Sequence, residues 1–177
     1  MMLSKQKQQT AFEALSADQG YKNRMRAPRI EKIVISSGTG KAKDKKRNEL
    51  VAEKLALITG QKASPRPSKT SIAQFKMREG DIVGFQVTLR GARMFDFLDK
   101  LIHIALPRTR DFRGISETGV DEMGNITIGI KENTIFPETS DEDLKDVFGL
   151  AITIVTSAKS KAEALAFFRH LGIPFKK

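Results

Sequence analysis

The residues Gly38-Thr39-Gly40-Lys41 are of types that could bind phosphate, since glycine-rich turns that end in lysine cradle phosphate groups. A Walker loop also needs a glycine five positions before the Gly-Lys pair and a serine or threonine after the lysine. Those two positions hold Ile35 and Ala42, so the turn does not predict a nucleotide hydrolase. Its backbone N–H groups and Lys41 could still meet a phosphate of RNA.

The other groups that carry chemistry in enzymes are absent or lack partners. The chain has no cysteine, which excludes disulfides, thiolate metal sites and cysteine nucleophiles. His103 and His170 lie on predicted helices without further ligands beside them, so we expect structural roles for both. The acidic residues near position 140 lack the spacing and glycine of a calcium loop. We therefore predict no catalytic residue, no metal site, no cofactor and no small-molecule substrate.

The charge of the chain is positive and unevenly distributed. Its 31 lysines and arginines exceed its 21 aspartates and glutamates, for a net charge of +10. Residues 39–79 carry eleven bases against four acids, whereas residues 80–177 carry thirteen against fourteen. A surplus confined to one part of the chain indicates a surface that faces a polyanion such as RNA.

The elements that must position these residues follow from hydrophobic spacing and from glycine and proline. Helices are predicted over residues 3–18, 43–59, 94–105 and 160–171, the last opened by a capping box at Ser160 and Glu163. Strands are predicted over residues 30–36, 83–89, 126–130 and 150–155. Residues 64–80 contain two prolines, several hydroxyl residues and four bases, which predicts an extended basic loop.

These elements predict one α+β domain over residues 1–177, with an N-terminal helix within residues 1–20. Each strand has one apolar and one polar face, as expected for an antiparallel sheet covered by helices on one face. The other face is left open. Its polar side chains include Thr88 and Arg90 and no aromatic residue, so it suits phosphates and 2′-hydroxyls better than stacked bases.

The sequence also resembles a known family along most of its length. The motifs that carry the resemblance run from about Tyr21 to the last residue: APRIEKIVISSGTGKA, ITGQK, KTSIAQFKMREGDIVGFQVTLRGARMFDFLDKL, ALPRTRDFRG, TIFPE and IPFKK. They are similar to the bacterial form of the universal ribosomal protein number five of the large subunit. This resemblance implies a non-enzymatic α+β protein of the cytoplasmic ribosome that binds 5S rRNA and large-subunit rRNA and helps to attach 5S rRNA in the central protuberance.

The resemblance further implies three contact surfaces, and for the second and third the charge pattern supplies the residues. The surface for 5S rRNA falls on Ser36, Gln61, Lys62, Thr88 and Arg90, with Ser36 standing where relatives commonly have asparagine. The basic loop reaches transfer RNA in the peptidyl site through Arg66, Lys69, Lys76 and Arg78. A bridge to small-subunit protein thirteen is expected at Glu138, Asp141, Glu142, Asp143 and Asp146, and other proteins of the central protuberance are expected neighbours.

Two other functions remain as alternatives. One is a nucleotide-binding enzyme that uses the turn from Gly38 to Lys41. The other is a basic protein that binds DNA or anionic surfaces by charge alone. No stretch of the sequence has the length and hydropathy of a membrane helix, and residues 1–10 lack the apolar core of a signal peptide, so we expect no membrane partner.

Overall fold

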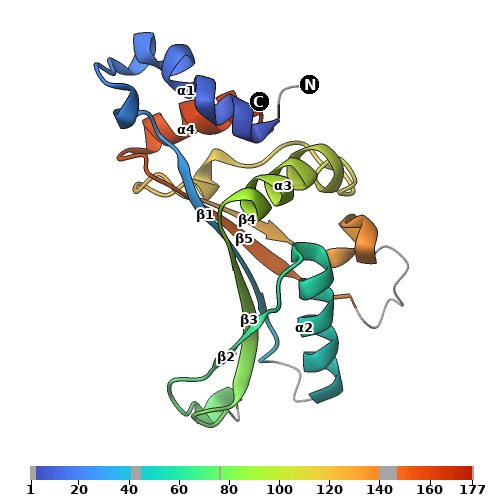
Figure 1. Ribbon diagram of the computed structural model, residues 1–177. Coiled ribbons are helices and arrows are strands. Elements are labelled where there is room, and N and C mark those ends of the chain that lie inside the picture. The colour runs from blue at the N-terminus through green and yellow to red at the C-terminus, as the bar shows by residue number, and fades with distance from the viewer. Residues whose placement is uncertain (1–2, 41–44, 76, 140–146, 177) are drawn as a thin grey trace. The chain divides into compact units, whose positions relative to one another are not determined.

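The computed structural model describes residues 3–40, 45–75, 77–139 and 147–176 (Figure 1). The longer helices are α1 (Ser4–Gln19), α2 (Lys45–Thr59), α3 (Ala92–Lys100) and α4 (Lys161–Leu171). The strands are β1 (Ile30–Gly38), β2 (Ser64–Pro67), β3 (Ile82–Leu89), β4 (Ile126–Ile130) and β5 (Leu150–Thr156). The predicted helices and strands are all present, and β2 is an additional strand.

The five strands form one sheet in the order β2-β3-β1-β5-β4. Neighbouring strands are antiparallel, as in the pairing of β2 with β3. Burial alternates along β4 and β5, where every second residue is buried. The predicted α+β fold with an antiparallel sheet is therefore confirmed, and one face of each of these strands supplies the core.

The single domain contains two compact units. Unit 1 comprises residues 1–33, 89–128 and 153–177, and unit 2 comprises residues 34–88 and 129–152. Helices α1, α3 and α4 belong to unit 1, whereas α2 and β2 belong to unit 2.

Unit 1 is held together by packing among its three longer helices. Helix α1 packs against α4 and α3 and buries Ala11 and Leu15. Its first turn is capped from another element, because the Ser4 N–H and hydroxyl both donate to Asp99 Oδ1, at 2.9 and 2.6 Å. Lys7 Nζ donates to the Leu171 carbonyl at the end of α4, at 2.9 Å. The N-terminal helix is thus fixed to α3 and α4 by polar contacts as well as by apolar burial.

Unit 2 combines α2 with the strand segments of residues 34–38 and 82–88. Helix α2 buries Val51, Leu55 and Ile58 at the helical spacing that its sequence predicts. Gly84 permits the close approach of two backbone segments, since a Cβ atom at this position would lie 2.7 Å from the Ser37 carbonyl oxygen.

Two local features differ from the sequence prediction. The predicted helix over residues 94–105 is α-helical to Lys100 and π-helical over Leu101–Ala105, where the Leu106 N–H donates to the Leu101 carbonyl. At the start of α4, Ser160 accepts from the Glu163 N–H, but the Glu163 carboxylate accepts from Lys159 instead of completing the capping box. Among the described residues, no helix has the length and hydropathy needed to cross a membrane.

Candidate nucleic-acid interface

A polar face in unit 2 is formed by the outward side chains of β1, β2 and β3. In β3, Phe85 and Val87 are buried whereas Gln86 and Thr88 are half-buried, and in β1 Ser36 is half-buried between two buried neighbours. Alternation along a strand therefore directs Ser36 and Thr88 away from the core. Both were predicted to contact RNA, and the fold leaves both accessible.

Strand β2 adds a cation to this face. The register pairs Ser64 with Gln86 and Arg66 with Gly84, and directly paired residues of an antiparallel sheet direct their side chains to the same face. Arg66 is exposed, and Gly84 opposite it has no side chain. The prediction that Arg66 belongs to an extended loop was wrong in this respect, since Arg66 lies in a strand beside the predicted 5S rRNA residues.

Gln61 is tied to β3 by its side chain. Its Nε2 donates to the Thr88 carbonyl at 3.3 Å, and its backbone carbonyl accepts from the Thr59 hydroxyl at 3.1 Å. The next residue, Lys62, is exposed. Gln61 therefore holds the turn after α2 against β3. Within the described residues, its amide oxygen and the Lys62 ammonium have no hydrogen-bond partner.

The hydroxyl groups on the sheet differ in whether they already have a hydrogen-bond partner within the protein. The buried Ser37 hydroxyl donates to the Gly149 carbonyl at 2.8 Å. In unit 1, the Thr127 and Thr153 hydroxyls lie 3.0 Å apart and bond to each other. The Thr88 hydroxyl, by contrast, has no hydrogen-bond partner within the described parts of the chain. Thr88 is thus a candidate for a contact that another molecule completes.

Arg90, the fifth predicted 5S rRNA residue, belongs to unit 1 and not to unit 2. It is exposed directly after β3, and its guanidinium donates to the Glu31 carbonyl at 3.5 Å. The structure therefore places Ser36, Gln61, Lys62 and Thr88 in one unit, and Arg90 in the other.

The basic segment after β2 is a hydrogen-bonded hairpin, not a featureless loop. Ser68 donates its N–H to Asp81 and accepts from the Gly80 N–H, at 2.8 and 3.0 Å. Ile72 and Met77 form an isolated bridge around a short 3₁₀ turn at Ala73–Phe75. The prediction of a loop over residues 64–80 is corrected to strand β2 followed by this hairpin.

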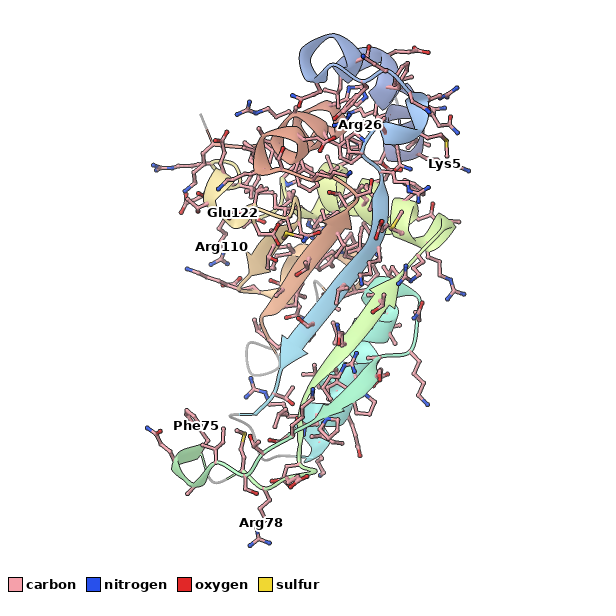
Figure 2. All side chains as sticks on the ribbon, turned by 90° about the vertical axis from the view of Figure 1, so that its left-hand side faces the viewer. Lys5, Arg26, Phe75, Arg78, Arg110 and Glu122 are labelled. Atoms are coloured by element: carbon pink, nitrogen blue, oxygen red, sulfur yellow. The ribbon has the colours of Figure 1, made fainter. Side chains whose placement is uncertain are left out.

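The side chains at the end of the hairpin are directed toward solvent. Lys69 and Arg78 are exposed, and 61% of the Phe75 surface is accessible. Figure 2 shows Phe75 and Arg78 at the end of the hairpin, with the Arg78 guanidinium directed away from the rest of the chain. Lys76 lies outside the described residues.

The acidic segment lies mostly outside the described residues, which include only Glu138 of the predicted bridge set. Glu138 is exposed within the short 3₁₀ helix Pro137–Thr139. Its neighbour Thr139 is buried and donates to the Asn133 carbonyl at 2.7 Å. The predicted bridge residues Asp141, Glu142, Asp143 and Asp146 are not in the described part of the chain.

The fold already uses one backbone N–H of the glycine turn. The Thr39 N–H donates to the Val83 carbonyl at 2.9 Å, so it is not available to a phosphate. Lys41 lies outside the described residues.

His170 has a structural role, because its Nε2 donates to the Lys7 carbonyl at 2.8 Å. Within the described residues, no three histidine, aspartate or glutamate side chains are grouped as metal ligands would be.

Comparisons with known proteins agree with this description. The family model for the C-terminal part of ribosomal protein L5 matches residues 82–175, and the model for ribosomal protein L5 matches residues 23–78. The large ribosomal subunit protein uL5 of Geobacter sulfurreducens is 49% identical over 165 residues, which cover 93% of this chain and 92% of the relative.

Two further relatives give similar matches. The uL5 protein of Malacoplasma penetrans is 52% identical over 166 residues, covering 93% of this chain and 89% of the relative. The uL5 protein of Spiroplasma kunkelii is 48% identical over 176 residues, covering 99% and 98%. Identity at this level over nearly the whole length establishes homology and a common fold, and the chain belongs to the ribosomal protein L5 family.

Proposed function

We propose that this chain binds 5S rRNA through the polar face of unit 2 and helps to attach that RNA in the central protuberance. As a member of its family it is a protein of the large ribosomal subunit in the cytoplasm, it partners with rRNA, and it is not an enzyme. The finer assignment to 5S rRNA is implied by the family resemblance, and one observation supports it. The accessible Thr88 hydroxyl has no partner within the described residues and lies beside the tethered Gln61.

The composition of this face favours recognition of RNA shape. Its side chains are hydroxyls, amides and a guanidinium, and these groups bond to phosphates and 2′-hydroxyls across a shallow minor groove. The outward positions named on β1, β2 and β3 hold no aromatic residue, so they offer no platform for stacked bases. Arg66 adds a charge that can pair with a phosphate in a bidentate manner.

The hairpin at residues 68–81 is proposed to contact transfer RNA in the peptidyl site. Lys69 and Arg78 are exposed and could meet backbone phosphates, which orient an RNA without reading its sequence. Such contacts suit a site that every transfer RNA visits. Lys76 is part of this proposal from the sequence alone.

The acidic segment from Glu138 to Asp146 is proposed to contact small-subunit protein thirteen. A group of carboxylates repels RNA phosphates and attracts a basic protein. This proposal is supported by the charge of the segment and by the family resemblance.

A titration separates this function from binding by charge alone. The full-length protein is titrated against 5S rRNA, transfer RNA and duplex DNA at one moderate salt concentration, and complexes are measured by gel shift. Specific recognition predicts the tightest binding for 5S rRNA, because shape and 2′-hydroxyl contacts add to the electrostatic attraction. Equal affinity for all three would contradict the proposal and support a non-specific basic protein.

A further inference from the structure

The turn that joins α1 to β1 is the most basic short segment of unit 1. Residues 22–29 read KNRMRAPR and carry four cations and no carboxylate. The cations are Lys22, Arg24, Arg26 and Arg29, and all four are exposed. No predicted contact with 5S rRNA, transfer RNA or protein involves these residues.

The backbone at the start of the turn is held in place by neighbouring elements. Gly20 ends α1 in the left-handed conformation, with φ at 65°. Tyr21 then packs inward, and its hydroxyl donates to Glu163 of α4 at 2.5 Å. Burial and this hydrogen bond raise the pKa of the Tyr21 phenol well above its ordinary value, so the phenol stays protonated at neutral pH.

The end of the turn is held by α1 and by the segment after β5. Arg29 donates its N–H to the Ser157 hydroxyl at 3.0 Å and accepts from the Ser157 N–H at 2.9 Å. The Ile30 N–H donates to Gln8 Oε1 of α1 at 2.9 Å. Figure 2 shows Arg26 beside the helices α1 and α4. Both ends of the turn are thus fixed within unit 1.

The backbone within the turn is also ordered, whereas its cationic side chains are exposed to solvent. Asn23 Oδ1 accepts from the Met25 N–H at 2.9 Å, and the Asn23 carbonyl accepts from the Arg26 N–H at 3.0 Å. Arg24 makes one long contact, 3.5 Å from its guanidinium to the Gln9 carbonyl. Met25 at the tip has 83% of its surface exposed. A fixed backbone that presents accessible cations lowers the ordering cost of binding a ligand.

Four like charges within eight residues repel one another. In the described part of the chain, no carboxylate forms an ion pair with any of the four cations. The Glu163 carboxylate accepts from the Tyr21 hydroxyl and the Lys159 N–H, and it forms no ion pair with the described residues of the turn. Among the described residues the cluster therefore makes no ion pair that would stabilise the folded chain, and a polyanionic ligand would relieve the repulsion.

The charge of the two units supports the same conclusion. Unit 1 contains eighteen lysines and arginines against ten acids, whereas unit 2 contains thirteen against eleven. Most of the predicted 5S rRNA residues nevertheless belong to unit 2. A polyanion that bound only unit 2 would leave the larger part of the positive charge without a counterpart.

We infer that residues 22–29 form a second RNA-binding surface, which contacts the sugar-phosphate backbone of large-subunit rRNA. This inference rests on the proposed function only in that the chain works on rRNA. Three of the four cations are arginines, whose planar guanidinium groups pair with phosphate oxygens in a bidentate manner. The turn has no aromatic side chain between Lys22 and Arg29, so it positions an RNA and does not read its bases.

The test compares two full-length variants that lose the same charge. In the turn variant, Lys22, Arg24, Arg26 and Arg29 are each replaced by glutamine. In the control variant, glutamine replaces four exposed lysines spread over unit 1: Lys5, Lys159, Lys161 and Lys176. Circular dichroism and the thermal midpoint verify that both variants are folded. We expect the turn variant to fold, because the hydrogen bonds of 3.0 Å or less that fix the turn come from backbone groups and from the side chains of Tyr21, Asn23, Gln8 and Ser157.

Binding is measured with a large-subunit rRNA transcript and with 5S rRNA over a salt series. We expect the turn variant to bind the large-subunit transcript about tenfold more weakly or worse, and the slope of log K against log salt to fall by about 3 in magnitude. Affinity for 5S rRNA should be unchanged. The control variant should retain most of its affinity for the transcript, because dispersed lysines do not act together on one stretch of backbone.

Three results would overturn the inference. Equal losses in the two variants would show that only the net charge matters. A loss confined to 5S rRNA would assign the turn to the 5S surface. Unchanged binding of both RNAs by the turn variant would exclude rRNA as the ligand of the turn. Failure of the wild-type protein to bind 5S rRNA would count against the proposed function alone, since the large-subunit transcript still tests the turn.

Discussion

Replacing Thr88 by valine removes one hydroxyl from the polar face of unit 2 and changes little else. Threonine and valine are both β-branched and similar in size, so the preference of β3 for extended backbone is retained. The Thr88 hydroxyl has no partner within the described residues, so no intramolecular hydrogen bond is lost there. We therefore expect the free energy of unfolding to change by less than about 0.5 kcal/mol.

The effect on 5S rRNA binding should be larger. An RNA group that bonds to Thr88 and stays desolvated in the complex loses its partner, at a cost of about 1 to 2 kcal/mol. This corresponds to an increase of about 5- to 30-fold in the dissociation constant. Fluorescence anisotropy with labelled 5S rRNA at one fixed salt concentration measures this change.

Thr127→Val is the matched control. The Thr127 and Thr153 hydroxyls already bond to each other at 3.0 Å, so neither needs an RNA partner. This variant should bind 5S rRNA as the wild-type protein does. Wild-type affinity in Thr88→Val, with folding intact, would refute the assignment of the polar face to 5S rRNA.

Three further predictions concern other parts of the molecule. Burial and the hydrogen bond to Glu163 raise the pKa of the Tyr21 phenol in the folded protein above its value of about 10 in the unfolded chain. The resulting stabilisation is therefore complete below about pH 10 and declines as the pH rises above it. Tyr21→Phe should remove this part of the decline and lower the free energy of unfolding at neutral pH by about 1.5 to 3 kcal/mol, as measured by urea unfolding. Identical dependence of stability on pH in the variant and the wild-type protein would contradict the role of Glu163. Ribosomes whose hairpin at residues 68–81 is shortened should lose peptidyl-site transfer RNA, more steeply as salt rises, while 5S rRNA binding persists; equal retention over a salt series would give the hairpin another role. Reversing several charges within residues 138–146 should weaken subunit association in light scattering and leave 5S rRNA binding intact, and loss of 5S rRNA binding would argue against a protein bridge.

The sequence predicted the core elements because their signals are local. Alternation in β4 and β5 and helical spacing in α2 each occupy one continuous stretch, so burial patterns follow from the chain order. Strand β2 was missed because its four residues are all exposed and two are prolines. An exposed strand has no apolar alternation, and prolines at alternate positions are the remaining signal for a strand at a sheet edge.

Charge was harder to interpret than burial. Counting along the chain makes residues 80–177 nearly neutral, which hides the bases that this segment contributes to unit 1. The role of Arg66 depended on the register of β2 with β3, which no pattern within β2 reveals. The Thr127 hydroxyl bonds to Thr153, whereas the Thr88 hydroxyl has no partner within the described residues. This difference likewise depends on contacts between residues that are far apart in the sequence.

The two prolines of β2 also affect the tendency of the free protein to self-associate before it is assembled into a ribosome. Strand β2 is at the edge of the sheet, where unpaired N–H groups would let copies of the chain join strand to strand. Pro65 and Pro67 have no backbone N–H, and Arg66 between them adds a positive charge that repels the same edge of a second copy. These residues disfavour pairing of two copies of the chain at the β2 edge, and replacing both prolines would be expected to increase the tendency of the free protein to aggregate.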